Sequence, residues 1–331
     1  MRILDAEAVR AALPMAEAIA AVRWAYVAFA TGKVTMPPRI HLPLVSEGSV
    51  SLVMPAVVAA SPEGRYPACY AVKTVSVCPA NAAQGLPVIQ GGVLVLDPET
   101  GGCLALLDGA ALTALRTGAG SGVATELLAR PDATTLAVLG AGGQAAAQME
   151  AVCAVRPIET VWLFDRARGK AEELGARWAG RNGIPLDIRV AGTVQEAVRD
   201  ADVVCTVTTS RSALFEDVDM KVGAHINAIG AFRPDMQEIP FATVGRARLF
   251  VDSREAVLHE AGDILLPMQA GLFGADHIVG EIGAALGGLL VGREREDQIT
   301  LFKSVGMAAQ DAVTAAVALR RAEIAQIGAC F

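Results

Sequence analysis

The stretch LAVLGAGGQAAAQ, residues 136–148, has the residue types that bring a backbone close to phosphate groups. Gly140, Gly142 and Ala145 follow the spacing G-x-G-x-x-[GA], directly after an apolar run and at the start of a helical pattern. The first glycine allows a tight turn, the second lets the backbone approach a pyrophosphate, and the small third residue lets the helix pack closely. The free N–H groups at the helix start attract anions. The pattern therefore predicts a dinucleotide site.

An acidic residue, Asp165, ends the next apolar segment, about 20 residues after this motif, where dinucleotide sites place an acid that binds the adenosine ribose. The alternative is a surface carboxylate that caps the following helix. Asp165 favours NAD(H), because a carboxylate repels the 2′-phosphate of NADP(H). Arg166 and Arg168 follow closely and could accept that phosphate, so NADP(H) stays open.

Three cations stand apart from this motif. Arg39 follows MPP, Lys73 lies in the strand-like segment YAVKTVS, and Arg116 lies in the small-residue helix LTALRTGAG. Taken singly, each has an ordinary explanation: a solvated loop residue, a lysine that reaches solvent from an edge strand, or an arginine paired with an acid. Because the chain as a whole is acidic, any anionic substrate would have to be held by locally placed cations.

The elements that must position these residues fall into two patterns. Residues 5–31 have helical spacing, and residues 33–60, with alternating β-branched residues and prolines, predict edge strands. Further strands follow, including a hairpin through DPETGG, and then a helix over 111–129. From Thr134 strands and helices alternate, which predicts an α/β fold with a doubly wound parallel sheet. A last helix covers 304–325.

Composition limits the function classes. The chain has 331 residues, is 53% hydrophobic and has a net charge of -7, so it has no general attraction to nucleic acid or anionic membranes. The acidic N-terminal pattern predicts an amphipathic helix rather than a signal peptide, and no uncharged apolar stretch reaches the roughly 18 residues of a membrane span. The six cysteines are scattered without a C-x-x-C pair, which favours a reduced, cytoplasmic protein.

Seven blocks, in order, carry a resemblance to a known family over nearly the whole chain. They are MPPR (36–39), AVKTVS (71–76), GLPVIQGGVLVLDPETG (85–101), LTALRTGAGSGVAT (112–125), LGAGGQA (139–145), INAIGAFRPDMQEI (226–239) and FKSVGMAAQDAV (302–313). On these blocks the chain resembles the ornithine cyclodeaminase/μ-crystallin family.

The resemblance implies a discontinuous organisation. Residues 1–115 and 303–331 would form a substrate-binding and dimerisation domain, and residues 116–302 an inserted Rossmann domain. It also implies a homodimer formed by the β-rich domains. On the family pattern Arg39, Lys73 and Arg116 clamp the carboxylate of an amino or imino acid, as guanidinium and buried ammonium groups can. Lys73, or a water that it orients, would also supply the proton near the reacting nitrogen.

Two positions distinguish among the activities of this family. The ornithine enzyme has an acid two places before the Met-Pro that recurs here at 54–55, and this sequence has Leu52. It has an aspartate where this sequence aligns Phe232, although nearby Asp235 could substitute if the loop differs. Without both acids, the second ammonium of a diamino acid would be buried unpaired, at a cost of several kcal/mol. A substrate with one carboxylate and an apolar or cyclic body fits better.

The leading hypothesis is therefore NAD(P)H-dependent reduction of Δ1-pyrroline-2-carboxylate or Δ1-piperideine-2-carboxylate to L-proline or L-pipecolate. The alternatives are an ornithine or lysine cyclodeaminase, a dehydrogenase of alanine or another amino acid, and a non-catalytic crystallin-like binding protein. Phe232 would form an apolar wall of the site, or else a core residue below it. Met54 and Gln90 are further candidates for the substrate cavity.

The cofactor would contact residues at the ends of several strands and on the helix of Arg116. The expected residues are Arg116, Thr117, Gly140, Gly142, Gly143, Gln144, Asp165, Arg166, Thr206, Val207, Thr208, Ile229 and Gly230. Ser121 is a weaker candidate because a small residue there also suits helix packing. His41 and His225 lack metal-ligand spacing, so no metal site is predicted. His259 has the position of a structural residue on a helix.

Overall fold

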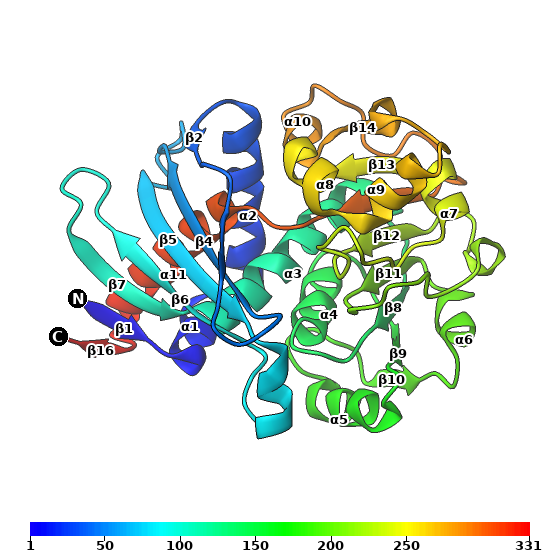
Figure 1. The fold of residues 1–331 in the computed structure, drawn as a ribbon, viewed down its shortest axis with the longest axis horizontal. Coiled ribbons are helices and arrows are strands. Elements are labelled where there is room, and N and C mark those ends of the chain that lie inside the picture. Colours follow the sequence, from blue (N-terminus) through cyan, green and yellow to red (C-terminus); the bar gives the residue numbers. More distant parts are fainter. The chain divides into compact units, whose positions relative to one another are not determined.

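Two eight-stranded sheets organise the chain in the computed structural model, which describes residues 1–331 apart from the side chain of Ala82 (Figure 1). Contacts divide the chain into two units. Unit 1 comprises Met1–Arg116 and Met307–Phe331, and unit 2 comprises Thr117–Gly306. Helix α3 (Gly109–Leu128) therefore begins in unit 1 and ends in unit 2.

Unit 1 is mainly an antiparallel sheet with three further helices. Its strand order is β16-β1-β7-β6-β5-β4-β2, with β3 paired to β4, and only the β1–β7 pair is parallel. The elements are β1 (Arg2–Leu4), α1 (Ala6–Ala12), α2 (Met15–Ala30), β2 (Val34–Thr35), β3 (Ile40–Pro43), β4 (Val50–Val58), β5 (Cys69–Val77), η1 (Pro79–Gln84), β6 (Ile89–Leu96), β7 (Cys103–Asp108), α11 (Ala308–Ala325) and β16 (Ala329–Cys330).

The single helix expected over residues 5–31 is wrong. The structure has two helices, α1 and α2, which meet at 81° on either side of Leu13 and Pro14. Proline disfavours the helical conformation of the residue before it and has no N–H to continue a helix, so it starts a new one. No single described helix is long and apolar enough to cross a membrane, although α1 and α2 taken together meet that criterion.

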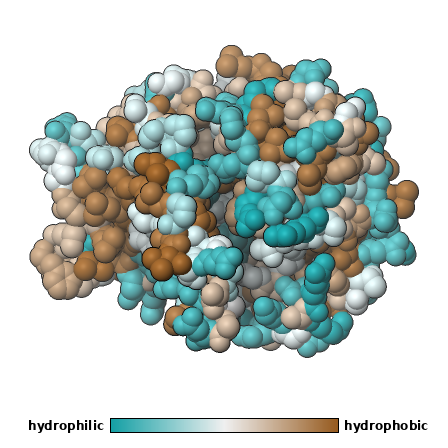
Figure 2. Space-filling view, in the orientation of Figure 1, coloured by the Kyte–Doolittle hydropathy of each residue, from teal (hydrophilic) through white to brown (hydrophobic). Residues whose placement is uncertain are grey.

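The two faces of the unit 1 sheet differ. Helix α11 packs against β4, β5 and β6, and the inward residues of these strands are buried, among them Met54, Ala71 and Val93. The opposite face keeps large apolar side chains exposed. These are Ile40, Leu42, Val57, Leu104 and Leu106. Figure 2 shows the apolar side chains gathered on the left, over the strands of unit 1. One face of this sheet thus forms a core, and on the other face these apolar side chains stay exposed among the described residues.

Unit 2 confirms the α/β class with a doubly wound parallel sheet. All its strand pairs are parallel, in the order β10-β9-β8-β11-β12-β15-β13-β14. The elements are β8 (Thr135–Leu139), α4 (Ala145–Cys153), β9 (Thr160–Phe164), α5 (Arg168–Trp178), β10 (Asp187–Val190), α6 (Val194–Val198), β11 (Val203–Thr206), η2 (Asp217–Asp219), β12 (His225–Ala228), α7 (Phe241–Arg246), β13 (Arg248–Val251), α8 (Arg254–Glu260), α9 (Gly262–Gln269), η3 (Ala275–His277), β14 (Ile278–Glu281), α10 (Ile282–Leu286) and β15 (Thr300–Lys303).

Strand β15 was not among the predicted strands, although it lies in the middle of the sheet between β12 and β13. Its sequence, TLFK, is short and ends in a lysine, so it has little strand signal of its own. Lys303 is nevertheless fully buried and pairs with Ala228. The expected domain limit between residues 302 and 303 falls inside this strand.

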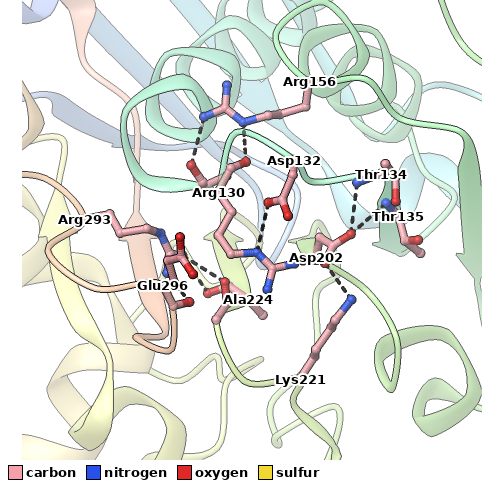
Figure 3. A network of polar contacts seen from close by, with 12 residues as sticks. Arg130, Asp132, Thr134, Thr135, Arg156, Asp202, Lys221, Ala224, Arg293 and Glu296 are labelled. Carbon is pink, nitrogen blue, oxygen red and sulfur yellow. Dashed lines mark hydrogen bonds and ion pairs between the residues drawn. The ribbon is translucent and has the colours of Figure 1, made fainter.

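The amino ends of the parallel strands are held by a network of cations and carbonyl groups (Figure 3). Asp202, before β11, accepts hydrogen bonds from Arg130 (2.5 Å) and Lys221 (2.7 Å) and from the backbone N–H groups of Thr134 (3.0 Å) and Thr135 (3.1 Å). Arg156 donates to four carbonyl oxygens at and after the end of α3. Ion pairs and hydrogen bonds between these groups therefore stabilise the amino edge of the sheet.

Candidate functional site

The glycine motif lies where the strand order of unit 2 reverses. Starting at β8, the chain builds β9 and β10 on one side of that strand and β11 and β12 on the other. Ligands of open α/β sheets bind outside the carboxyl ends of the strands at this reversal. Gly140 has a φ of 103°, and a Cβ there would meet the Val207 carbonyl oxygen at 2.9 Å, so only glycine suits the turn.

Space beside the motif fits a dinucleotide. A Cβ added to Gly142 or Gly143 would meet nothing within 4 Å, so the backbone is open to a ligand there. The side-chain oxygen of Gln144 is buried and has no hydrogen-bond partner among the described residues. Free backbone N–H groups at the start of α4 add a partial positive charge. These residues could hold a pyrophosphate.

Asp165 stands directly after β9, beside the same loop. Its Oδ2 accepts a hydrogen bond from the N–H of Ala141, and its Oδ1 accepts one from the N–H of Ala167, both at 2.8 Å. The carboxylate is thus held in place, and each oxygen keeps further acceptor capacity for hydroxyl groups of a ribose. Arg166, the next residue, is exposed.

The ends of β11 and β12 are tied together by Glu238, which the sequence did not single out. Its Oε2 accepts from the Thr206 hydroxyl (2.7 Å) and the Gly230 N–H (2.7 Å), and its Oε1 accepts from the Thr208 N–H (2.6 Å). The structure therefore brings together Thr206, Val207, Thr208, Ile229 and Gly230 at one edge of the sheet. Burial raises the pKa of Glu238, as does Asp263 beside it, whereas Lys303 and the Thr206 hydroxyl lower it.

A second polar cluster, in unit 1, is centred on Asp311 of α11. Its Oδ2 lies 2.7 Å from Lys73 Nζ, and its Oδ1 lies 2.9 Å from Arg116 Nε. Arg116 also donates to Gln310 Oε1 at 3.2 Å. The side chains of Lys73 and Asp311 are each 1% exposed and that of Arg116 is 7% exposed. Two buried cations thus share one carboxylate, so these three side chains carry a net positive charge when Lys73 is protonated.

The net positive charge of the cluster contributes to a lowered pKa of Lys73. Burial lowers the pKa of Lys73 from 10.5 to about 7, helped by the charges of Arg116 and Arg39, although Asp311 opposes the change. The structure therefore brings Lys73 and Arg116 together at Asp311, with Lys73 able to hold or release a proton near neutral pH. Arg39 stays a predicted member of this site.

The strand register decides which other candidates accompany Lys73. Met54 stands directly opposite Lys73 on β4 and is 4% exposed, so the two share a face of the sheet. Gln90 pairs with Ser76, three positions from Lys73, so the pleat directs its side chain to the other face. Its expected place in the cavity beside Lys73 is therefore wrong. Leu52 shares the Lys73 face.

Phe232 and Asp235 follow β12 in unit 2. Phe232 is partly buried and packs against the hydrophobic core of that unit, which is the second of the two positions considered for it. Asp235 forms ion pairs with Arg233 at 3.0 Å and with Arg211 at 3.2 Å. Its carboxylate is thus already paired, which weakens the idea that it replaces the missing acid of the ornithine enzyme.

The remaining candidates have structural surroundings. Thr117 and Ser121 are buried in α3, and the Ser121 hydroxyl has no partner among the described residues. His225 is fully buried between Thr300 (3.0 Å) and Asn227 (3.2 Å), and burial lowers its pKa to about 3. His259 contacts its own helix through the Glu255 carbonyl. Across the described residues, no group of three His, Cys, Asp or Glu side chains could hold a metal ion.

Comparison with known proteins finds a matching family and similar reductases. The sequence profile of the ornithine cyclodeaminase/mu-crystallin family matches residues 1–324. A Delta(1)-pyrroline-2-carboxylate reductase from Bacillus cereus is 40% identical over 316 residues, which cover 95% of this chain and 94% of that protein.

Two solved structures are similar over almost the full length. The Thermococcus litoralis Delta(1)-pyrroline-2-carboxylate reductase in complex with NADH and L-proline is 36% identical, with a TM-score of 0.93 and 100% of each chain covered. An archaeal alanine dehydrogenase dimer with bound NAD is 33% identical, with a TM-score of 0.90 and 99% of this chain and 98% of that chain covered.

Proposed function

Because the chain belongs to the ornithine cyclodeaminase/mu-crystallin family, we propose that it is an oxidoreductase that reduces a cyclic imino acid with a nicotinamide cofactor. The substrate would be Δ1-pyrroline-2-carboxylate or Δ1-piperideine-2-carboxylate, and the product L-proline or L-pipecolate. The observation that carries the proposal is the buried pair of cations, Lys73 and Arg116, that shares the single carboxylate of Asp311.

A bound substrate carboxylate would neutralise the net positive charge of this cluster. Burial and the neighbouring charge of Arg116 disfavour the ammonium form of Lys73 more than Asp311 favours it, which explains the lowered pKa of Lys73. A substrate carboxylate supplies a further counter-charge, so Lys73 keeps its proton when the substrate is present. Arg116 offers a rigid guanidinium that fixes the orientation of a carboxylate, and Arg39 adds a third cation.

Proton transfer to the imine nitrogen is the part of the reaction assigned to Lys73. The cofactor, when bound, supplies a hydride to the carbon of the C=N bond. Lys73 holds the proton that the nitrogen gains, and a pKa about 7 suits that role near neutral pH. Met54 lies beside Lys73 as an apolar neighbour for the ring of the substrate.

The cofactor is proposed to bind along the carboxyl edge of the unit 2 sheet, with its pyrophosphate at Gly140, Gly142 and Gly143. Similar proteins bind NADH or NAD. The carboxylate of Asp165 supports NAD(H) over NADP(H), because it is held beside the loop where a 2′-phosphate would meet its charge. Unit 2 is thus proposed as the nucleotide-binding domain and unit 1 as the substrate-binding domain.

A homodimer is proposed through the exposed apolar face of the unit 1 sheet. Leu106, on β7, is 39% exposed, and Ile40, on β3, is 51% exposed, so the patch extends across the strands. Contiguous apolar patches of this kind mark interaction surfaces.

A cytoplasmic location is proposed from the six cysteines, none of which forms a disulfide, because free thiols suit a reducing compartment.

One assay series tests the proposed reaction. Oxidation of NADH and of NADPH is followed separately with the five- and six-membered cyclic imino acids, with pyruvate plus ammonia, and without substrate. The expected result is turnover of a cyclic imino acid with NADH preferred. Ammonia release from ornithine or lysine without added cofactor would instead identify a cyclodeaminase, and turnover of pyruvate plus ammonia alone would identify an alanine dehydrogenase.

A further inference from the structure

Glu238 has no role in the proposed reaction so far, yet it is a fully buried acid at the end of the sheet where the cofactor is expected. It lies in the segment INAIGAFRPDMQEI, which the family resemblance included without giving this residue a role. Burying a carboxylate away from water costs free energy unless several hydrogen-bond donors surround it. Here the donors come from two neighbouring strands.

The hydrogen bonds of Glu238 fix how β11 and β12 end. One oxygen binds the Thr206 hydroxyl and the Gly230 N–H, both at 2.7 Å, and the other binds the Thr208 N–H at 2.6 Å. A Cβ on Gly230 would collide with the Glu238 carboxylate, so glycine is required for this approach. One side chain therefore sets the relative positions of both strand ends.

Glu238 is itself anchored by a second buried acid. Asp263, in the first turn of α9, accepts hydrogen bonds from the backbone N–H groups of Glu238 (2.7 Å) and Ile239 (3.0 Å). Its other oxygen pairs with Lys303 of β15 at 3.1 Å, and all three charged side chains are fully buried. The carboxylate of Glu238 is thus held at its backbone as well as at its oxygens.

This arrangement decides what the strand ends can offer a ligand. The N–H groups of Thr208 and Gly230 and the hydroxyl hydrogen of Thr206 are all directed to Glu238, so these donors are occupied. The carbonyl oxygens of Val207 and Ile229 accept no hydrogen bond from the described residues. These carbonyl oxygens are therefore available as acceptors, and the NH2 of a carboxamide has two hydrogens to donate.

In a doubly wound sheet of this order, the strands beyond the reversal receive the second nucleotide of the cofactor. We propose that Glu238 is the positioning residue for the nicotinamide half, keeping the ends of β11 and β12 so that their carbonyl groups accept from the nicotinamide carboxamide. The proposal rests on the dinucleotide site of the proposed function. It requires no contact between Glu238 and the cofactor, because Glu238 acts through Thr206, Thr208 and Gly230.

Calorimetric titration tests the proposal without relying on turnover. NADH, ADP-ribose, which lacks nicotinamide, and reduced 3-acetylpyridine adenine dinucleotide, which lacks the amide NH2, are each titrated into the wild-type protein and Glu238→Gln. The amide of the variant can no longer accept from every donor, so one strand end shifts. The expected result is about a 10-fold or greater loss of NADH affinity, an ADP-ribose affinity within about 2-fold of wild type, and loss of the preference for NADH over the acetyl analogue.

Glu150→Gln is the matched control, because Glu150 is a buried acid of the same unit that accepts a hydrogen bond from Asn182 at 2.6 Å. It should leave all three affinities unchanged. Thr206→Val is a second variant, which removes one donor to Glu238 with little change of shape, and a smaller loss of the same kind is expected. This variant decides the matter if Glu238→Gln does not fold.

Three outcomes overturn the proposal. One is an unchanged ratio of NADH to ADP-ribose affinity in both variants, and another is an equal loss for both ligands, which would mean a general structural role. The third is a wild-type protein that binds no dinucleotide. A wild-type protein that binds NADH with the expected preferences but reduces no imino acid would contradict the proposed reaction and leave the role of Glu238 intact.

Discussion

Two buried aspartates, Asp202 in unit 2 and Asp311 in unit 1, each pair with two cations, yet these cations differ in their exposure to water. At Asp202 the side chains of Arg130 and Lys221 are 22% and 36% exposed. At Asp311 the side chains of Lys73 and Arg116 are 1% and 7% exposed. At the first site a second carboxylate, that of Asp132, pairs with Arg130 at 3.3 Å, and water reaches the cations. At the second site two buried cations share one carboxylate away from water.

The second oxygen of each carboxylate sharpens the contrast. At Asp202 it accepts two backbone N–H groups, and these bonds with Lys221 outweigh the effect of burial, so the pKa of Asp202 is lowered. At Asp311 it pairs with Lys73, whose pKa falls to about 7. A site that is complete in itself stabilises the fold, whereas a buried site with excess charge is suited to bind an anion.

The largest expected effect comes from removing the excess charge with Lys73→Met. The variant loses a carboxylate ligand and the proton donor but keeps the Asp311–Arg116 pair. We expect kcat/KM for the imino acid to fall by about 10²- to 10⁴-fold, while the midpoint of thermal unfolding stays the same or rises. Steady-state kinetics and thermal melts measure both. Unchanged kcat/KM would remove Lys73 from the proposed reaction.

Asp202→Asn should lower stability and leave substrate binding unchanged, the opposite of Lys73→Met. It removes the carboxylate that Arg130 and Lys221 share, while Arg130 keeps its ion pair with Asp132 at 3.3 Å. Because both cations are also partly exposed, the loss is smaller than for a fully buried pair. We expect the free energy of unfolding to fall by about 1–3 kcal/mol, with KM for the imino acid unchanged. Urea denaturation and kinetics at a temperature where the variant is folded give the two values. A large rise in KM would contradict the contrast between the two aspartates.

The pH dependence of activity distinguishes the sealed cluster. The free enzyme carries a protonated Lys73 below pH about 7 and loses that proton above it. As an acid that gives its proton, Lys73 is active in the protonated form, so kcat/KM should fall about tenfold per pH unit above its pKa. The limb in kcat should lie at higher pH, because bound carboxylate favours the charged lysine. Lys73→Met should lack this limb, and a limb retained in that variant would assign it to another group.

Local patterns were enough to predict much of the fold. The glycine motif, Asp165 and the alternation after Thr134 are features of short segments, and the parallel sheet follows from them. The break at Pro14 could have been predicted from its effect on the preceding residue. Strand β15 could not, because four residues ending in lysine become a central strand only through neighbours far away in the chain.

The site shows the same limit. Arg39, Lys73 and Arg116 received a shared role through the family resemblance. Asp311, the partner of Lys73 and Arg116, lies far along the chain in a helix with the sequence AAQDAVTAAVA. An acidic residue within such an apolar helix could have been chosen as a candidate site residue, but the helix sequence does not show which cations it contacts. The prediction for Gln90 was wrong because the face of its side chain depends on its pairing with Ser76, and that pairing cannot be deduced from either strand alone.

The smallest effect is expected for Lys221→Met, which tests whether exposure is what separates the two aspartates. Lys221 lies 2.7 Å from Asp202 Oδ1, as close as Lys73 lies to Asp311, but its side chain is 36% exposed. Exposed ion pairs contribute about 0–1 kcal/mol, because water already stabilises both charges. Urea denaturation should therefore show a loss of less than about 1 kcal/mol, with kcat and KM unchanged. A loss as large as that of Asp202→Asn would mean that one cation carries the whole network, and the contrast would then rest on geometry rather than on access to water.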